Sequence, residues 1–411
     1  MHIYWKQKRI DNFVSPLLFY FCENKTKQNK MKIKSTQTIP FALFLITLAV
    51  NLSMPLFRPY AALAGFNNGQ TSLVLATYVL GMIPCYIFLG GISDKIGRKP
   101  VLIFSLFCAL ISDLTISIYP NVYALIFARF FQGIALGLSM GTGTAYLAEI
   151  LYPNPDAPTR AANATSMSTA LGFSGGAFIT TVALLIHFTH SPITYFLAVI
   201  ITLIGIILAF YLPNLPPIGG SVLRLPYFPK GSFPVNLSIA ICWAATGVVI
   251  SIIPTQLAKF GFAAYAGFCL VLINWTGAFL QPYIRKNIAP NLSVKLGFAL
   301  VPIGFGLVIL GCFYGILPVV LIGTAIIGSA AYGFSYQGGL ALIANLGGKQ
   351  RARAVSGYMF YGYIGFGIPA VFLGYLADSF GIINALLVFE ISITMLSIYL
   401  FLTFEKKDEI N

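Results

Sequence analysis

Long apolar runs alternate with short polar segments along nearly the whole chain. A helix needs roughly 20 residues to cross about 30 Å of hydrocarbon, and twelve runs reach that length. The pattern predicts transmembrane helices over residues 39–63, 71–91, 100–119, 122–147, 163–187, 192–212, 234–257, 263–283, 293–314, 316–345, 354–377 and 382–403. We therefore predict an all-α membrane protein with twelve transmembrane helices.

A proline-rich segment over residues 213–233 separates the sixth predicted helix from the seventh. Because proline interrupts helices, we expect this segment to be a cytoplasmic linker. It divides the chain into an N-terminal six-helix bundle over 39–212 and a C-terminal six-helix bundle over 234–404, with a cytoplasmic tail over 405–411. Six helices on each side suggest two related halves, so we expect the bundles to be pseudo-symmetric.

The first 38 residues are polar and basic, and we expect them to form an N-terminal cytoplasmic tail. Met31 lies directly before a basic stretch and the first apolar run. A translation start at Met31 is therefore as reasonable as one at Met1, which would make residues 1–30 a mis-assigned extension.

Positive charge is concentrated on one side of the predicted membrane. With the N-terminus in the cytoplasm, 22 of the 25 Lys and Arg residues fall in cytoplasmic segments, and only Lys259 falls on the opposite side. This pattern predicts an inner-membrane protein with both termini in the cytoplasm. The net charge of +14 would also suit a nucleic-acid partner, but its spread over many short loops favours the lipid bilayer instead.

Composition narrows the class of protein further. Only 9% of the residues are charged and 58% are hydrophobic, whereas about a quarter of a soluble domain is charged. Three histidines and six cysteines without a CxxC pair predict neither a metal site nor a cofactor. A membrane-embedded enzyme would need clustered catalytic side chains near one face, so that class is the least favoured alternative.

The clearest motif lies between the second and third predicted helices. It reads Gly90-Gly91-Ile92-Ser93-Asp94-Lys95-Ile96-Gly97-Arg98-Lys99 and resembles the G-x-x-x-D-[RK]-x-G-[RK]-[RK] signature of the major facilitator superfamily. Every fixed position is matched, on the cytoplasmic side where the family has it. The alternative, an ordinary basic loop that obeys the positive-inside rule, is less favoured because all positions match.

The fixed residues of this motif have expected roles in conformational change. Gly90 should allow close helix approach, and Gly97 should allow a tight turn. We expect Asp94 to accept hydrogen bonds from a neighbouring helix N-terminus, where the macrodipole favours an anion. Arg98 and Lys99 should anchor to anionic headgroups or pair with acids.

A weaker copy of the motif lies in the second half of the chain. It stands 187 residues after the first motif and again joins the second and third helices of a bundle. The copy consists of Gly277, Gln281, Arg285 and Lys286, so a glutamine replaces the acid. An ancestral duplication accounts for this spacing.

The fourth predicted helix opens with Arg129-Phe130-Phe131-Gln132-Gly133. This segment resembles the R-x-x-Q-G motif of facilitator-superfamily transporters, whose arginine is associated with proton coupling in drug–proton antiporters. A charged residue inside a membrane is costly unless it meets an acid, a carbonyl or water. The resemblance therefore assigns Arg129 and Gln132 to substrate binding or proton coupling. The alternative is an Arg129 side chain that snorkels to the near surface.

Three more polar residues lie within predicted helices and are candidates for the same site. The family places its first and fourth helices around a central cavity, so the resemblance implies that Arg58 and Arg129 face it and favour an anionic or carboxylate-bearing substrate. The prolines that flank Arg58 predict a locally broken helix. Asp113 is expected to partner one of the arginines, and Asn51 to contact substrate or a neighbouring helix.

Glu149 ends the fourth predicted helix near the cytoplasmic face. Pairing with Arg98 or Arg160 would close that side in one conformation and break in the other. A solvated acid at a helix end is the equally reasonable alternative.

The resemblance covers residues 39–404, nearly the whole chain. It implies secondary active transport of a small molecule by a monomer whose two bundles rock around a central site. We predict proton-coupled efflux of a drug or metabolite, with import of a sugar, organic acid or siderophore as the alternative. The fifth helix, with Gly172-Phe173-Ser174-Gly175-Gly176, lacks the proline and spacing of the antiporter motif. The direction of transport therefore stays open.

Overall fold

The computed structural model describes residues 35–186 and 193–408. These residues form helices joined by turns and short loops, and no strand occurs among them. The predicted N-terminal tail lies outside the described residues, except that its last four already belong to the first helix, Ser35–Leu63. Met31 also lies outside them.

The described residues contain eleven helical segments that are long and apolar enough to cross a membrane. One of them, Leu317–Phe380, has 64 residues, which at 1.5 Å per residue is about three times the thickness of the hydrocarbon layer. A short 3-10 turn, η4 (Gly348–Gln350), divides it, and Gly348 at this turn has a φ of +47°. Each of the two parts that this turn separates is long enough to cross the membrane once. The segment therefore counts as two transmembrane helices, and the prediction of twelve is confirmed.

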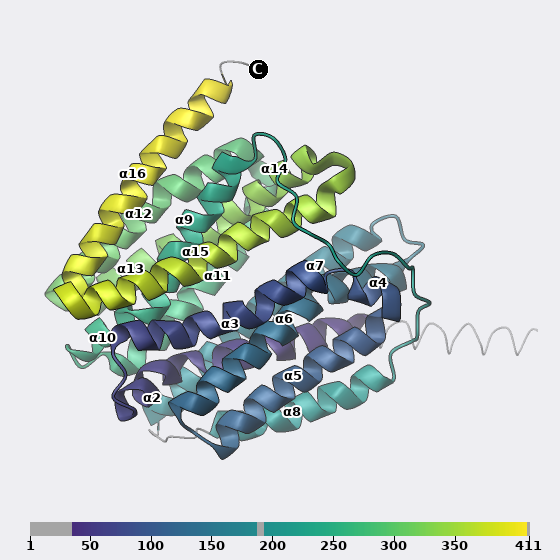
Figure 1. Cartoon of the computed structure of the whole chain (residues 1–411), viewed down its shortest axis with the longest axis horizontal. Coiled ribbons are helices and arrows are strands. Elements are labelled where there is room, and N and C mark those ends of the chain that lie inside the picture. Colours follow the sequence, from purple (N-terminus) through teal and green to yellow (C-terminus); the bar gives the residue numbers. More distant parts are fainter. Residues whose placement is uncertain (1–34, 187–192, 409–411) are drawn as a thin grey trace, which may run out of the picture.

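The twelve helices form two bundles, which Figure 1 shows one above the other. The first bundle consists of the helix Ser35–Leu63, α3 (Asn68–Phe88), α5 (Arg98–Ile118), α6 (Val122–Leu151), α7 (Ala157–Ile186) and α8 (Ile193–Phe210). The second consists of α9 (Phe233–Ser251) with α10 (Ile253–Ala258), α11 (Ala266–Asn287), α12 (Pro290–Tyr314), α13 (Leu317–Gly328) with η3 (Ser329–Ser335) and α14 (Tyr336–Gly347), α15 (Arg351–Phe380) and α16 (Ile382–Asp408).

Local sequence explains where several helices begin and end. Asn67 and Gln70 form a capping box at the start of α3, which satisfies backbone N–H groups that have no partner within the helix. Gly315 and Gly381 follow α12 and α15 with φ values of +70° and +86°, a region that glycine enters without steric cost.

The first helix is broken, as its prolines predicted. A 3-10 turn, η1 (Met54–Leu56), interrupts it, and the chain continues as α2 (Phe57–Leu63), which carries Arg58. Proline removes a backbone donor and crowds the preceding turn, which explains the change of helix type.

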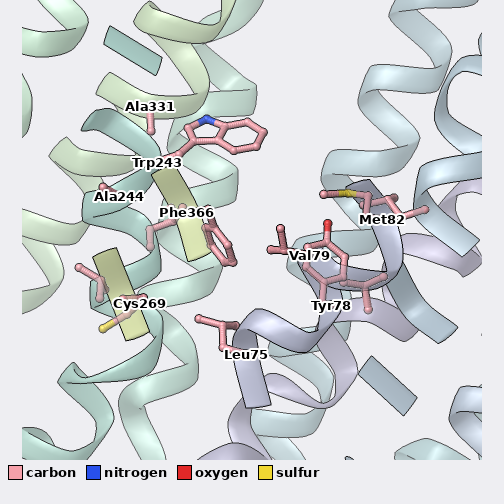
Figure 2. Close-up of a cluster of buried hydrophobic side chains, with 14 of the residues drawn as sticks. Leu75, Tyr78, Val79, Met82, Trp243, Ala244, Cys269, Ala331 and Phe366 are labelled. Carbon is pink, nitrogen blue, oxygen red and sulfur yellow. The ribbon is translucent and has the colours of Figure 1, made fainter. Parts of the chain in front are cut away.

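The two bundles meet along α3 and α15. Figure 2 shows Tyr78 and Val79 of α3 facing Phe366 of α15 across this interface. A Cβ added at Gly374 of α15 would lie 2.7 Å from Ser72 Oγ of α3. The absence of a side chain at Gly374 therefore lets the two helices approach closely.

Asp378, near the end of α15, joins the bundles at the same interface. Its carboxylate accepts hydrogen bonds from the backbone N–H groups of Asn68, at 3.0 Å, and Gly69, at 2.9 Å. These are the first N–H groups of α3, and a helix N-terminus favours an anion. Direct contact between α3 and α15 is therefore strongest at this end.

Glycines of α7 make a close helix contact within the first bundle. A Cβ added at Gly176 would lie 2.3 Å from the carbonyl oxygen of Leu48, whereas one added at Gly175 would lie 4.0 Å from the ring of Phe44. We expect Gly176→Ala to destabilise the protein by about 1–3 kcal/mol, because backbone must move to admit the methyl group. Thermal unfolding of the purified protein measures this, with Gly175→Ala as the matched control. Equal melting temperatures for the two variants would contradict the packing described.

Candidate functional site

Three cavities follow one another along the interface between the bundles. The largest, of about 620 Å³, lies beside the basic loops, and we call it the basic-side cavity; its walls include Tyr86, Gly90, Arg224, Tyr336 and Tyr363. A small central cavity, of about 70 Å³, comes next and is lined in part by Asn51, Arg129, Tyr332 and Phe366. The third, of about 420 Å³, is the far-side cavity, and Arg58, Thr71 and Pro254 are among its lining residues.

Shared wall residues make these cavities one path. Trp243, Tyr332 and Tyr363 line both the basic-side and the central cavity. Met54 and Leu270 line both the central and the far-side cavity. The central cavity is the smallest of the three and forms the narrow part of the path.

Arg129 lines the central cavity and is fully buried. Its NH1 group donates to the carbonyl oxygen of Val50 and to Gln132 Oε1, both at 2.8 Å. Its Nε and NH2 groups have no hydrogen-bond partner among the described residues. Arg129 is therefore a buried cation with two unsatisfied donor groups, on a residue that lines the central cavity, and it does not snorkel to the surface.

Two aromatic rings and a glutamine hold Arg129 in place. The guanidinium carbon lies 4.6 Å from the ring centre of Tyr78 and 5.3 Å from that of Phe57, distances at which an aromatic face attracts a cation. Gln132 Nε2 donates to the carbonyl of Ala49 at 3.0 Å and to Ser112 Oγ at 2.7 Å. Gln132 is thus a positioning residue that ties Arg129 to α5 and to the first helix.

Asp113 is fully buried in α5, and the expected ion pair with an arginine is not formed in the described part of the chain. Neither carboxylate oxygen has a hydrogen-bond partner there. Asp113 and Arg129 are therefore not paired with each other.

Arg58 and Asn51 occupy different parts of the path. Arg58 is half-buried and lines the far-side cavity, not the central one, because the break at Met54–Leu56 redirects the chain. The expectation that Arg58 and Arg129 share one cavity is wrong in this conformation. Asn51 lines the central cavity and donates from Nδ2 to the carbonyl of Phe173 in α7 at 2.9 Å.

Aromatic residues line much of the central and basic-side cavities, and most of them were not singled out from the sequence. Trp243 lies 5.3 Å from Tyr332 and 4.9 Å from Tyr363, measured between ring centres. Tyr86 lies 5.8 Å from Tyr363. Aromatic residues are common throughout this apolar sequence, so only the packing of the helices distinguishes those that face the path.

The motif at Gly90–Lys99 forms a charged cluster at the basic end of the path. Asp94 makes ion pairs with Arg98 and with Arg224 of the linker, so the expected partner of Asp94, a helix N-terminus, is replaced by two guanidinium groups. Arg98 also pairs with Glu149 at 2.8 Å, as one sequence hypothesis proposed. Its NH1 group donates to Ser93 Oγ at 2.7 Å.

The remaining motif residues shape the turn around this cluster. Gly97 has a φ of +99° between α4 (Ile92–Ile96) and α5, which confirms the expected tight turn. Lys99 Nζ donates to the carbonyl of Phe210 at 2.7 Å, and Lys95 is exposed. A Cβ added at Gly90 would lie 2.8 Å from the carbonyl oxygen of Tyr86 and 3.5 Å from Arg224 Cβ, so the missing side chain leaves room for the end of α3 and for the linker.

The second-half copy makes contacts between the bundles. Gln281 donates to the carbonyl of Tyr332 at 3.0 Å and accepts from Ser166 of α7 at 3.1 Å. Arg285 donates to Asn163 of α7 at 2.8 Å. Two more residues complete the copy: Gly277, where an added Cβ would lie 2.4 Å from Tyr332 Cβ, and Lys286, which is exposed.

Twelve apolar helices in two bundles, with a buried path between them, define a multi-pass membrane transporter. The family model described as Major Facilitator Superfamily matches residues 40–286. The chain belongs to this superfamily of transporters and is not an enzyme.

Individual relatives match only parts of the chain or only its fold. An uncharacterized transporter of Buchnera aphidicola is 28% identical over 162 residues, which is 38% of each chain. The quinolone resistance protein NorA of Staphylococcus aureus is 26% identical over 110 residues, covering 27% of this chain and 28% of NorA. The crystal structure of the nucleoside transporter NupG superposes with a TM-score of 0.72 at 12% identity, over 90% of this chain and 99% of NupG.

Proposed function

We propose that this protein exports a small organic anion with an aromatic or other planar apolar part, by proton-coupled alternating access. The observation that carries this proposal is the buried Arg129, whose Nε and NH2 groups have no partner at the narrowest part of the path. A buried unpaired cation is costly, and a carboxylate or sulfonate that bridges two guanidinium donors would remove that cost.

The aromatic residues of the cavity walls indicate that the substrate has a planar apolar part. Trp243, Tyr332 and Tyr363 line both the basic-side and the central cavity. Such rings favour planar apolar groups through stacked and edge-to-face contacts. A substrate with one negative charge and a flat apolar body would satisfy Arg129 and the rings together.

The far-side cavity offers a second station for the same anion. Arg58 is its single charged wall residue, and the other walls are mostly apolar. In this proposal the substrate moves from Arg129 to Arg58 as the bundles rock, so that release begins at a weaker, half-exposed cation.

Arg58 lines only the far-side cavity, so its replacement should affect uptake from the far side more than uptake from the basic side. We expect Arg58→Gln to raise the KM for uptake from the far side by about tenfold, because a cation at the rim of a site acts mainly on capture. Uptake from the basic side should change less than threefold. Reconstituted vesicles of known orientation measure both, with Arg58→Lys as the charge-preserving control. Equal changes on both sides would contradict the separate station.

Asp113 is the proposed proton carrier. Its carboxyl group is fully buried without a hydrogen-bond partner in the described residues, and an ionised carboxylate in such a place is costly. Loss or gain of a proton at Asp113 would therefore change the relative free energies of the two conformations. Ser112, the neighbour of Asp113 in α5, accepts a hydrogen bond from Gln132, which also binds Arg129, and this connection supports coupling between proton and substrate.

Export from the cytoplasm is the proposed direction, with the basic side facing the cytoplasm of an inner membrane as the positive-inside rule indicates. The similarity to NorA, named as a quinolone resistance protein, supports efflux. Import remains the alternative function, because the basic-side cavity alone does not define direction.

One sequence of experiments tests substrate and direction. Untargeted comparison of metabolites in cells with and without the gene identifies compounds whose cellular level changes. Proton-driven accumulation of such a compound in inverted membrane vesicles supports export. Uptake into whole cells without accumulation in inverted vesicles would contradict it.

The charged cluster at the basic end is proposed to stabilise one conformation. Asp94, Arg98 and Glu149 tie the ends of three helices of the first bundle together, and such pairs break or form as a transporter changes state. We propose that a monomer is sufficient, because the whole path lies between the two bundles of one chain.

A further inference from the structure

The linker between the bundles does not loop freely away from them. Its middle part, residues 219–228, which we call the strap, lies at the end of the molecule where α4 is found (Figure 1). The strap contacts both bundles through hydrogen bonds, an ion pair and ring packing.

The first set of strap contacts is with the motif of the first bundle. The N–H of Gly91 donates to Val222 O at 2.9 Å, and the N–H of Gly219 donates to Asp94 O at 2.9 Å. The guanidinium of Arg224 pairs with the Asp94 carboxylate. A Cβ added at Gly91 would lie 2.1 Å from the strap carbonyl of Ser221, so the two backbones touch.

The second set of contacts is with α15 of the other bundle. The N–H of Tyr227 donates to Arg353 O at 3.1 Å, and Arg353 Nε donates back to Leu225 O at 2.8 Å. The ring of Phe228 packs edge-on against Tyr361, with 5.6 Å between ring centres. Residues only a few positions apart in the strap thus hold opposite bundles.

Direct contact between α3 and α15 stops where the strap begins. From Asn68, which binds Asp378, to Tyr86, which packs on Tyr363, the two helices meet directly. Beyond Tyr86, the hydrogen bonds, ion pairs and ring contacts described above all run from α3 and α4 to the strap, and from the strap to α15. The strap therefore occupies the gap between the basic-side ends of α3 and α15.

We propose that the strap is a wedge that holds the basic-side cavity open, with Arg224 as its lock on Asp94. The bundles already meet on this side where Arg285 of α11 binds Asn163 of α7, so closing the cavity requires the basic-side ends of α3 and α15 to come together as well, and the strap fills the space between them. The strap must break its contacts with Gly91, Asp94 and α15 before the bundles rock. The strength of these contacts therefore sets the ratio of the two conformations. The inference rests on the alternating access of the proposed function but not on its substrate or coupling ion.

Two substitutions weaken the contacts between the strap and the first bundle in different ways. Arg224→Gln removes the ion pair with Asp94, and the Arg224 side chain is 38% exposed, so its loss leaves no unfilled core. Gly91→Ala adds a methyl group against the strap backbone without changing any charge. Gly175→Ala is the matched control, because its added Cβ would approach no atom closer than 4.0 Å.

The experiment measures distances across both ends of the full-length protein in lipid nanodiscs. Spin labels on Asp156→Cys and Lys349→Cys, both exposed, report on the basic side. Labels on Tyr119→Cys and Tyr314→Cys, which are each 64% exposed, report on the far side. The five described native cysteines are buried, and labelled protein without the introduced pairs corrects for background.

We expect both strap variants to raise the ratio of basic-side-closed to basic-side-open molecules about fivefold, as expected for one partly exposed ion pair. The 156–349 distance should shorten while the 119–314 distance lengthens, and Gly175→Ala should match the wild type. Wild-type distance distributions in folded Arg224→Gln protein would overturn the wedge, whatever Gly91→Ala does. Because no substrate is present, this result is independent of whether Arg129 binds an anion.

Discussion

Arg129→Lys is expected to lower the rate of substrate transport by about a hundredfold, since truncating one partner of a buried charge pair costs about 2–5 kcal/mol. Lysine keeps the charge but lacks the planar fork that bridges two oxygens of a carboxylate. Lysine would also lose the stacked contact with Tyr78, whose ring centre lies 4.6 Å from the guanidinium carbon. The measurement is transport by reconstituted protein at saturating and sub-saturating substrate.

A control must separate this effect from a loss of folding. Arg351→Lys changes the same residue type at an exposed position outside the path, and it should transport like the wild type. A melting temperature of Arg129→Lys close to that of the wild type, together with normal transport, would remove Arg129 from the site.

A second substitution tests the positive charge of Arg129. Gln132 Oε1 lies 2.8 Å from Arg129 NH1, so Gln132→Glu would give the guanidinium a permanent carboxylate partner. We expect this variant to bind an anionic substrate at least tenfold more weakly, because the cation is already neutralised. Its melting temperature measures the cost of losing the hydrogen bond that Gln132 Nε2 donates to the Ala49 carbonyl. Unchanged affinity would show that the substrate does not meet Arg129.

The spans and the broken first helix could be predicted from sequence because each depends on local chemistry. A bilayer demands about 20 apolar residues per crossing, and prolines beside Arg58 disturb any helix that contains them. The turn at Gly97, with its φ of +99°, follows in the same way from the conformational freedom of glycine.

The arrangement of the path could not be predicted because it depends on residues far apart in the chain. Arg58 and Arg129 lie in helices that do meet, yet the 3-10 turn at Met54–Leu56 places Arg58 in a separate cavity. Trp243 and Tyr363 line the path only because α9 and α15 pack together there. No local pattern distinguishes them from the other aromatic residues of the sequence.

The partner of Asp94 also could not be predicted, because it lies far away in the sequence. The motif spacing predicted an anion near a helix terminus, but the linker brings in Arg224 from 130 positions along the chain. A proline-rich linker is usually interpreted as a passive connection. The bonds between Gly91 N–H and Val222 O and between Tyr227 N–H and Arg353 O are backbone hydrogen bonds, which any sequence can make, so they could not be predicted from the sequence.

Asp113→Asn is expected to abolish transport driven by a proton gradient while leaving substrate exchange intact. Asparagine has nearly the same shape and hydrogen-bonding groups but cannot bind or release a proton. Exchange of labelled for unlabelled substrate needs the bundles to rock with substrate bound, so it does not require a proton to leave. Both rates can be measured in the same vesicles, with and without an imposed pH gradient.

Glu390 provides the matched control for Asp113. It lies half-buried in α16 of the second bundle, where Thr394 donates to its Oε1 at 3.4 Å, whereas Asp113 and Arg129 both lie in the first bundle. Glu390→Gln should therefore keep gradient-driven transport, although it too removes a titratable carboxyl group from within the membrane. If Asp113→Asn kept gradient-driven transport and Glu390→Gln lost it, the proton would travel through the second bundle. The carboxyl group of Asp113 would then have no part in coupling.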